Sequence, residues 1–227
     1  MVSAVIVAAG KGTRMHGEVP KQYLLLEKLP ILSHTLMAFE ACERIQEVVL
    51  VIPERDRTYC RENIIAPINV SKDLKFVAGG DKRQDSVYRG LSAISRHSGI
   101  VVIHDGVRPF VRSDQLDAVI NGAEQFGACI LGIPAQDTLK ELDAAETIVR
   151  TIQRDKIWLA QTPQAFQSDL IMKAHTTARR NEYLSTDDAS LVEQLGVKVK
   201  IIRGGRNNIK ITNQEDLAIA RALMRYR

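Results

Sequence analysis

Mostly apolar runs rich in Val and Ile recur between residues 4 and 133, and segments with helical periodicity separate them. The runs cover residues 4–8, 48–52, 75–78, 100–103 and 129–133. Runs without polar alternation are typical of parallel strands that are buried on both faces of a sheet. The pattern therefore predicts βαβ units and an α/β, Rossmann-like fold, in which a mostly parallel sheet carries helices on both faces.

Between these runs, apolar residues recur at helical spacing. The predicted buried faces are Leu32, Leu36 and Phe39 after Pro30; Val87, Leu91 and Ile94; and Leu116, Ile120 and Ala123 after a capping Ser113. The helical pattern resumes near Ser168, and a late strand is expected over residues 197–202. Asn213 is expected to cap a last helix that buries Leu217, Ala220 and Met224.

The alternation of strands and helices stops between Pro134 and Pro163. This segment is polar, with β-branched islands at residues 147–149 and 151–152. A bare loop of this length is uncommon in a compact domain. We therefore expect residues 134–163 to form an extended hairpin, or arm, inserted into a single domain that spans residues 1–227.

Composition excludes several classes of protein. Lys and Arg outnumber Asp and Glu by 31 to 27. Because this excess is spread along the chain, it suits an anionic small molecule better than a nucleic acid. No apolar stretch approaches the roughly 20 residues of a membrane span. Three widely spaced cysteines, Cys42, Cys60 and Cys129, exclude a disulfide framework and favour a cytoplasmic location.

The first candidate site follows the first predicted strand. Ligands of open α/β sheets bind beyond the carboxyl ends of the strands. The segment AAGKGTRM occupies residues 8–15, and its glycines allow backbone N–H groups to approach phosphate oxygens. Its spacing matches neither the Walker loop nor the dinucleotide motif. A tight turn with solvated basic residues is the alternative, but the three cations Lys11, Arg14 and Lys21 favour a phosphate site.

Two further polar segments follow later strands. In the segment HDGVRP, Asp105 could reach a Mg²⁺ ion that phosphates also hold, or it could cap the loop or pair with Arg108. We interpret His104 as structural, since no second histidine supports a metal site. In GGDKRQDS, residues 79–86, the glycines admit a base or ribose; the alternative is an ordinary helix start. Residues 186–188 are interpreted as a helix N-cap only.

Together these motifs resemble a known family. AAGKGTRM and PKQY are similar to the signature of nucleotidyltransferases that join a sugar phosphate to a nucleoside triphosphate. GGDKRQDSV, HDGVRPF, TPQAF and NIKIT narrow the resemblance to the 2-C-methyl-D-erythritol 4-phosphate cytidylyltransferases of the non-mevalonate isoprenoid pathway, over essentially the whole chain. The resemblance implies transfer of a cytidylyl group from CTP to methylerythritol phosphate, with Mg²⁺ and release of pyrophosphate.

The resemblance also implies a role for each matching residue. Arg14 and Lys21 match transition-state stabilisers, and Arg154 and Lys210 match residues that position the sugar phosphate. Asp105 matches the Mg²⁺ carboxylate. The implied CTP-binding residues are Ala8, Ala9, Gly10, Lys11, Gly12, Gly80, Asp81, Ser86 and Gly106, and the implied residues for the second substrate are Thr138, Arg108 and Thr162.

The resemblance further implies a homodimer. Residues 134–163 match a dimerisation arm, so that Thr138 and Arg154 would complete the neighbouring subunit's site. Asn207 departs from the family pattern, which often has Asp at this position. An amide oxygen can bind Mg²⁺ but supplies no negative charge, so the resemblance does not imply a second metal carboxylate here. The nearest alternative is a ribitol 5-phosphate cytidylyltransferase. A non-catalytic nucleotide-binding protein is expected to lose Arg14, Lys21 or Lys210, all of which are present, and a nucleic-acid-binding module has no use for the glycine-rich loop.

Overall fold

A computed structural model describes residues 1–10 and 19–226. Its strands are β1 Val2–Val7, β2 Leu25–Leu26, β3 Leu29–Pro30, β4 Glu47–Ile52, β5 Asp73–Ala78, β6 Ile100–Asp105, β7 Ala128–Pro134, β8 Leu139–Leu142, β9 Ile148–Ile152, β10 Trp158–Gln167 and β11 Lys200–Arg203. Its α-helices are α1 Ile31–Glu40, α2 Arg57–Tyr59, α3 Arg83–Leu91, α4 Ser113–Phe126, α5 Ser168–Arg180, α6 Asp188–Glu193 and α7 Gln214–Met224. Shorter helical turns are η2 Lys21–Tyr23, η3 Glu54–Asp56 and the π-helical η4 Cys60–Ile65.

The central sheet confirms the predicted α/β topology. Its strand order is β11-β7-β10-β6-β1-β4-β5. Within the described chain, the pairings are parallel except for the two made by β10, which runs antiparallel to β6 and to β7. The apolar periodicity did not predict β10, because residues 158–163 fall within the expected insertion and belong instead to this strand.

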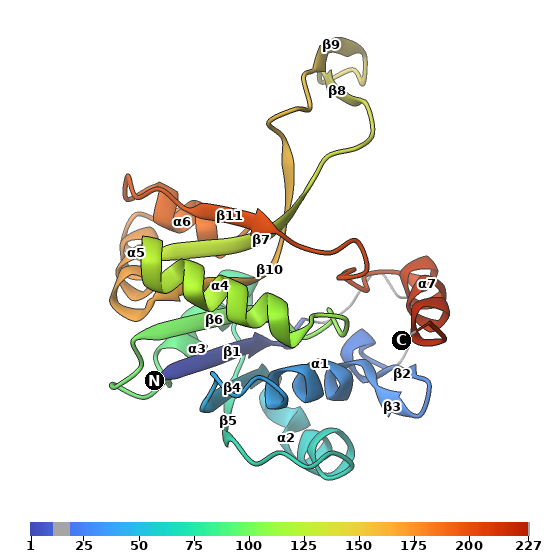
Figure 1. Cartoon of the computed structure of the whole chain (residues 1–227), viewed down its shortest axis with the longest axis vertical. Helices are drawn as coiled ribbons and strands as arrows, with labels where there is room; N and C mark the ends of the chain where they lie inside the picture. The colour runs from blue at the N-terminus through green and yellow to red at the C-terminus, as the bar shows by residue number, and fades with distance from the viewer. Residues whose placement is uncertain (11–18, 227) are drawn as a thin grey trace.

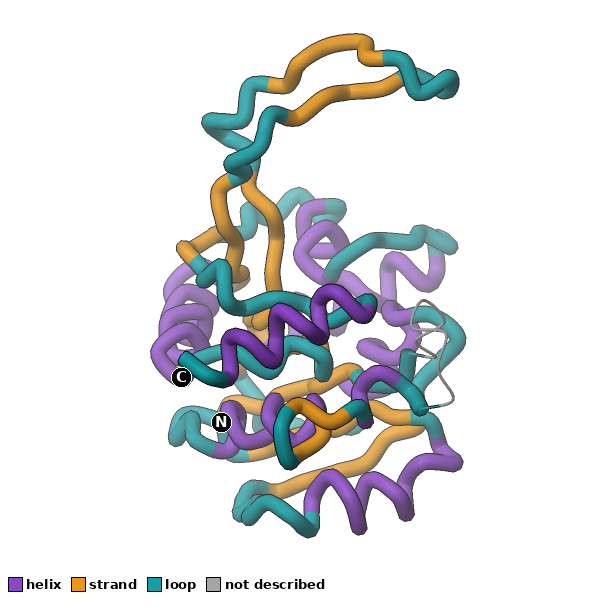
Figure 2. The backbone as a smooth tube through the Cα atoms, turned by 90° about the vertical axis from the view of Figure 1, so that its right-hand side faces the viewer, coloured by secondary structure: helices purple, strands orange, loops and turns teal. Residues whose placement is uncertain are grey.

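Helices cover both faces of the sheet, as the sequence predicted (Figure 2). On one face, Ala4 and Ile6 of β1 belong to a buried cluster with residues of α1 and α4. On the other face, Val5 of β1 packs in a cluster with residues of α3, α5 and α6. Burial of both faces explains why the sequence of β1 is a nearly continuous apolar run, interrupted only by Ser3, rather than an alternating pattern. A third cluster joins α7 to the β2–β3 hairpin and to the loop after β6.

Several element boundaries differ from the sequence-based expectation. The late strand β11 covers residues 200–203 rather than 197–202, while Val197 and Val199 pack partly buried against the core. Ser113 is the first residue of α4 and not its cap, which is Arg112. The cap of α7 is as predicted: the Asn213 side chain accepts a hydrogen bond of 2.8 Å from the backbone N–H of Asp216.

An extended hairpin projects from the sheet beyond β7 and β10, at the top of Figure 1. It consists of β8 and β9, which pair antiparallel. Three of its apolar side chains are more than half exposed: Leu142, Ile148 and Val149. Its turn is closed by backbone N–H groups of Ala145 and Thr147, which each donate to the Asp143 carboxylate at 2.9 Å. An extended hairpin is therefore present, as the sequence predicted. Residues 158–163, which the prediction placed within the insertion, belong instead to β10 of the central sheet.

The three cysteines are free and buried in the structure. Among the described residues, no helix has both the length and the apolar character needed to cross a membrane.

Candidate active site

The carboxyl ends of β1, β5 and β6 border a cavity of about 300 Å³. This is the edge of the sheet where α/β proteins bind ligands. The cavity brings together residues that the sequence singled out for CTP, namely Ala8, Ala9, Gly10, Lys21, Gly80, Asp81 and Ser86. It also contains Asp105, expected to bind the metal, and Lys210, expected to position the sugar phosphate. Val7, Gln22, Lys82, Arg83 and Val107 also line it.

A second cavity of about 250 Å³ adjoins the first. Arg108 and Thr162, two of the residues expected at the second substrate, lie in its wall. Ala160, Gln161, Gln164, Thr186 and Asp187 line it as well. Arg83, Asp105 and Lys210 line both cavities and thus form a common wall between them.

Asp105 is at the centre of this common wall, with its side chain only 7% exposed. Its Oδ1 accepts from Arg83 Nε at 3.1 Å, and its Oδ2 lies 2.9 Å from Lys210 Nζ and 3.5 Å from Arg108 Nε. Burial opposes ionisation of Asp105, but these neighbouring charges hold its pKa well below the usual range. The carboxylate is therefore ionised, and the cations around it leave an excess of positive charge that suits a polyanion.

Two local features bring these cations to Asp105. The turn after β6 is closed by a 3.1 Å hydrogen bond from the Arg108 N–H to the Asp105 carbonyl. Farther along the chain, the N–H of Ile211 donates to the Val107 carbonyl at 3.0 Å, which holds Lys210 beside β6. In addition, Arg108 Nη1 donates to the Asn208 carbonyl at 2.8 Å. Lys210 is therefore placed by backbone pairing and not by its charge alone.

The glycine pair after β5 packs directly against the end of β1. A Cβ atom on Gly79 would lie 2.1 Å from the Cβ of Ala9, and one on Gly80 would lie 2.4 Å from the Cβ of Asp85. The N–H of Gly80 donates to Ser86 Oγ at 3.0 Å. The glycines thus permit close contact between two chain segments at the edge of the cavity.

Lys21 belongs to a helical turn that is anchored by its buried neighbours. The Tyr23 hydroxyl donates to Asp56 Oδ2 at 3.0 Å, and the Tyr23 N–H donates to the Pro20 carbonyl at 2.9 Å. Gln22 is also buried and reaches the cavity wall. The backbone at Lys21 is therefore fixed by its two buried neighbours, Gln22 and Tyr23.

His104 has the structural role that the sequence suggested. Its side chain is fully buried, and its Nε2 lies 3.1 Å from the Arg108 carbonyl. Burial lowers its pKa to about 4, so the imidazole is neutral at physiological pH. His104 lines neither of the two described cavities.

Some predicted site residues lie elsewhere. Thr138 and Arg154 flank the β8–β9 hairpin, and the Arg154 guanidinium donates to the Gln136 carbonyl. Gly106 packs next to Ala8 but is not part of the described cavity wall. Asn207 is exposed and lines neither described cavity. Lys11, Gly12 and Arg14 fall outside the described residues.

The sequence reasoning missed Arg83 and understated Asp188. Arg83 is the first residue of α3, where its positive charge opposes the helix dipole. An arginine at this unfavourable position of a helix could have indicated from the sequence that its side chain has a role outside the helix. Asp188, assigned only to a helix cap, is buried and lies 2.8 Å from Arg83 Nη1. The residue that caps α6 is the preceding Asp187.

The donor set at the common wall fits a magnesium ion that phosphates share. The described residues hold no cluster of three or more His, Cys, Asp or Glu side chains that could bind a metal without substrate. Asp105 is a single ionised carboxylate on the cavity surface. Mg²⁺ commonly takes one or two carboxylates and completes its shell with phosphate oxygens and water.

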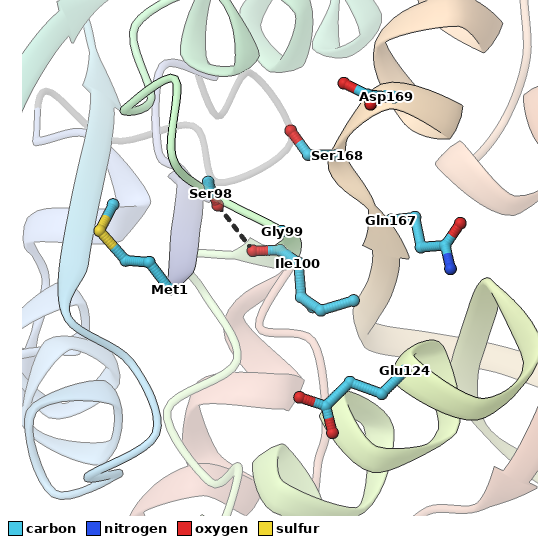
Figure 3. Close-up of a pocket in the computed structure, with 8 residues that line it drawn as sticks. All are labelled: Met1, Ser98, Gly99, Ile100, Glu124, Gln167, Ser168 and Asp169. Carbon is cyan, nitrogen blue, oxygen red and sulfur yellow. Dashed lines mark hydrogen bonds between the residues drawn. The ribbon is translucent and has the colours of Figure 1, made fainter.

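Another hollow, of about 420 Å³, lies at the amino ends of β1 and β6 (Figure 3). Its wall includes two carboxylates, Glu124 and Asp169, and contains no Lys or Arg among the described lining residues. The Ser98 hydroxyl in this wall donates to the Ile100 carbonyl at 2.9 Å. The charge of this hollow does not suit phosphate, and its position is opposite to the ligand-binding edge of the sheet.

The mostly parallel sheet, its glycine turns and the cation-lined pair of cavities define a nucleotide-binding α/β protein with room for two anionic substrates. The family model for IspD, 2-C-methyl-D-erythritol 4-phosphate cytidylyltransferase, matches residues 2–226. The chain belongs to this family, and it is accordingly an enzyme of the nucleotidyltransferase class.

Individual relatives agree with this assignment. The 2-C-methyl-D-erythritol 4-phosphate cytidylyltransferase of Pelotomaculum thermopropionicum is 45% identical, over 100% of this chain and 95% of its own. The enzyme of the same name from Syntrophus aciditrophicus is 46% identical, over 99% and 96% of the two chains. The crystal structure of 4-diphosphocytidyl-2C-methyl-D-erythritol synthase from Anaerococcus prevotii superposes with a TM-score of 0.87 at 32% identity, covering 99% of this chain and 96% of that one.

Proposed function

We propose that this chain transfers a cytidylyl group from CTP to 2-C-methyl-D-erythritol 4-phosphate at the common wall of the two cavities. The observation that carries the proposal is that the residues expected for the two substrates line two different, adjoining cavities. Residues expected to bind CTP line the first cavity, while Arg108 and Thr162, expected at the sugar phosphate, line the second. Two substrates bound in this way would meet beside Arg83, Asp105 and Lys210.

The first cavity offers groups for both ends of CTP. Gly80, Asp81 and Ser86 would receive the nucleoside, with hydrogen-bonding groups beside a glycine backbone. At the end of β1, the backbone from Ala8 to Gly10 and the Lys21 ammonium group would receive the phosphates. The family resemblance implies that Arg14, which lies outside the described residues, also acts on the phosphates.

The reaction needs positioned cations and no catalytic base. A phosphate oxygen of the sugar phosphate attacks the α-phosphorus of CTP; a P–O bond forms there, the bond to the β-phosphate bridge breaks, and pyrophosphate leaves with the electron pair. The attacking phosphate is already an anion at neutral pH. Lys21 and Lys210 would stabilise the charge that develops on the α-phosphate oxygens and the leaving group.

Asp105 would hold Mg²⁺ together with phosphate oxygens of CTP. When bound, the ion neutralises phosphate charge and favours departure of pyrophosphate. The cations around Asp105 keep the carboxylate ionised, so that it remains a competent ligand over the physiological pH range.

The projecting hairpin supports a homodimer in which each arm completes the other subunit's site. Thr138 immediately precedes β8, Arg154 follows β9, and neither residue lines the two described cavities of its own chain. The exposed Leu142, Ile148 and Val149 give the arm an apolar surface that a second copy would cover. A reducing cytoplasmic location is supported by the three free thiols.

The test is pyrophosphate release in the presence of CTP and Mg²⁺, with methylerythritol phosphate and ribitol 5-phosphate compared in parallel. We expect release with methylerythritol phosphate and a strong preference for it. Preference for ribitol 5-phosphate would retain the chemistry at the common wall but overturn the proposed substrate. Silence with both substrates, from folded dimeric protein, would overturn the catalytic proposal.

A further inference from the structure

Arg83 is held between two buried carboxylates. Its Nε donates to Asp105 Oδ1 at 3.1 Å, and its Nη1 donates to Asp188 Oδ2 at 2.8 Å. The carboxylate side chains are 7% and 1% exposed. The two bonds use different edges of the guanidinium group, so the orientation of Arg83 at the common wall depends on both partners.

Asp188 is in turn fixed from two sides. Its Oδ1 lies 3.0 Å from Nε2 of His175, which is fully buried on α5. Its backbone N–H donates to Gln164 Oε1 on β10 at 3.2 Å. Asp188 does not line either cavity among the described residues, so it cannot act by touching a substrate. A continuous series of contacts therefore runs from His175 through Asp188 and Arg83 to Asp105.

A purely structural ion pair between α3 and α6 is a poor explanation of these contacts. Buried ion pairs are often replaceable by packed apolar residues without loss of stability. Arg83 also adds positive charge to the first turn of α3, which is unfavourable for the helix dipole. The arrangement thus carries costs that helix packing does not require, and it directs a guanidinium group at the carboxylate in the common wall.

We propose that Asp188 is a positioning residue for the transfer reaction and acts through Arg83. Asp188 holds one edge of the guanidinium group, which limits Arg83 to a single hydrogen bond with Asp105 and leaves the rest of that carboxylate for Lys210 and a metal. His175 holds Asp188 in turn. This inference rests on the proposed function. Without Asp188, Arg83 is free to pair more fully with Asp105 and to shift the charges at the common wall.

A double-mutant cycle tests whether Asp188 acts through Arg83. The proteins are wild type, Asp188→Asn, Arg83→Gln and the double variant. We expect Asp188→Asn to lower kcat about tenfold to a hundredfold, as misplacement of catalytic groups does, with a change of less than about twofold in KM for CTP. We expect the double variant to lose no more than Arg83→Gln alone. Multiplied losses in the double variant would overturn the proposal.

The matched control is Asp169→Asn. Asp169 is an exposed aspartate in the first turn of α5, as Asp188 is in the first turn of α6. Both substitutions remove a favourable helix-dipole interaction, but only Asp188 contacts Arg83. We expect kcat of Asp169→Asn to stay at the wild-type value. A comparable loss of kcat in this control would attribute the Asp188 effect to helix stability and overturn the proposal.

Arg83→Lys keeps the test decisive if Arg83→Gln, which removes the arginine partner of Asp188, causes the protein to unfold. A lysine keeps the charge but cannot bond two carboxylates along a planar fork. We expect Arg83→Lys to fold and to show the same loss of kcat as Asp188→Asn; full activity would overturn the proposal.

Calorimetric binding of CTP, at a series of Mg²⁺ concentrations and without the second substrate, supplies a readout besides turnover. We expect Asp188→Asn to need more Mg²⁺ for half-maximal binding than Asp169→Asn does. Equal Mg²⁺ dependence in the two variants would overturn the proposal. Absence of turnover in the wild type would instead defeat the proposed function, which keeps the two failures distinct.

Discussion

Asp105 is surrounded by more positive charge than its own ionisation requires. One well-placed arginine lowers the pKa of a carboxyl group substantially, yet Arg83, Arg108 and Lys210 all lie within 3.5 Å of its oxygens. The carboxylate brings these three cations together at the common wall. In the proposed reaction, phosphate oxygens would offer the same cations further partners, and Asp105 would then serve as the metal ligand.

Replacing Asp105 with Asn should raise the Mg²⁺ concentration needed for half-maximal turnover by about tenfold or more, because the amide keeps an oxygen but loses the charge that binds a hard cation. Initial rates over a series of Mg²⁺ concentrations measure this shift. The exposed Asp114, which pairs with Arg112 on the surface, provides the control Asp114→Asn. An Mg²⁺ titration of Asp105→Asn that superposes on the wild-type curve would count against its role.

Replacing Lys21 with Ala should lower kcat by about 10²–10³-fold, the range found when one preorganised electrostatic group is removed. The fold should survive, because the hydrogen bond from the Tyr23 hydroxyl to Asp56 anchors the turn. Steady-state kinetics and circular dichroism measure the two effects. Lys28→Ala removes an exposed lysine seven residues later and should change neither. Unchanged turnover in Lys21→Ala would remove its assigned role.

At the scale of elements, the turn after β5 shows how packing shapes the cavity. The contact between Gly79 and Ala9 joins two strand ends without room for a methyl group. We expect this contact to set the distance between the proposed phosphate and nucleoside ends of the first cavity. The glycine pair therefore has two effects: Gly79 allows the turn after β5 to pack against Ala9, and Gly80 lines the cavity without a side chain that would fill it.

Replacing Gly79 with Ala should push this turn away from the end of β1 and raise KM for CTP by about tenfold, with a loss of about 1–3 kcal/mol in stability from overpacking. Steady-state kinetics and denaturant unfolding measure both. Gly99→Ala is the matched control at the opposite end of the sheet, where a Cβ would meet its nearest neighbour at 3.9 Å. Similar behaviour of the two variants would show that the Gly79 contact does not shape the cavity.

The same scale shows what could be predicted from the sequence. Parallel strands could be predicted because burial on both faces makes the sequences of β1 and β4 apolar apart from Ser3 and Glu47. Strand β10 was not visible, since WLAQTPQAFQ mixes polar residues and a proline, and its place between β6 and β7 comes from long-range pairing. The bond between Arg83 and Asp188 joins residues 105 positions apart, which no local pattern reports.

At the scale of the whole molecule, the arm is the feature that a single chain does not explain. It projects from the ends of β7 and β10, away from the remainder of the described fold (Figures 1 and 2). Isolated two-stranded hairpins are marginally stable in water, and Leu142, Ile148 and Val149 add exposed apolar surface. A second copy would stabilise the hairpin and cover that surface, and symmetry would then make the exchange of arms reciprocal.

Reciprocal arms make a specific prediction about mixed dimers. Arg154→Ala and Lys21→Ala should each be nearly inactive alone. If Arg154 serves the neighbouring site, a hybrid dimer contains one site with both substitutions and one site with neither. Random mixing makes half of the dimers hybrid, so the activity of the mixture should recover to about a quarter of the wild-type value, and that of purified hybrids to about half. Co-purification of differently tagged subunits isolates the hybrids, and the turnover of this fraction is compared with the expected half. If hybrids form and remain inactive, Arg154 must act within its own chain or not at all.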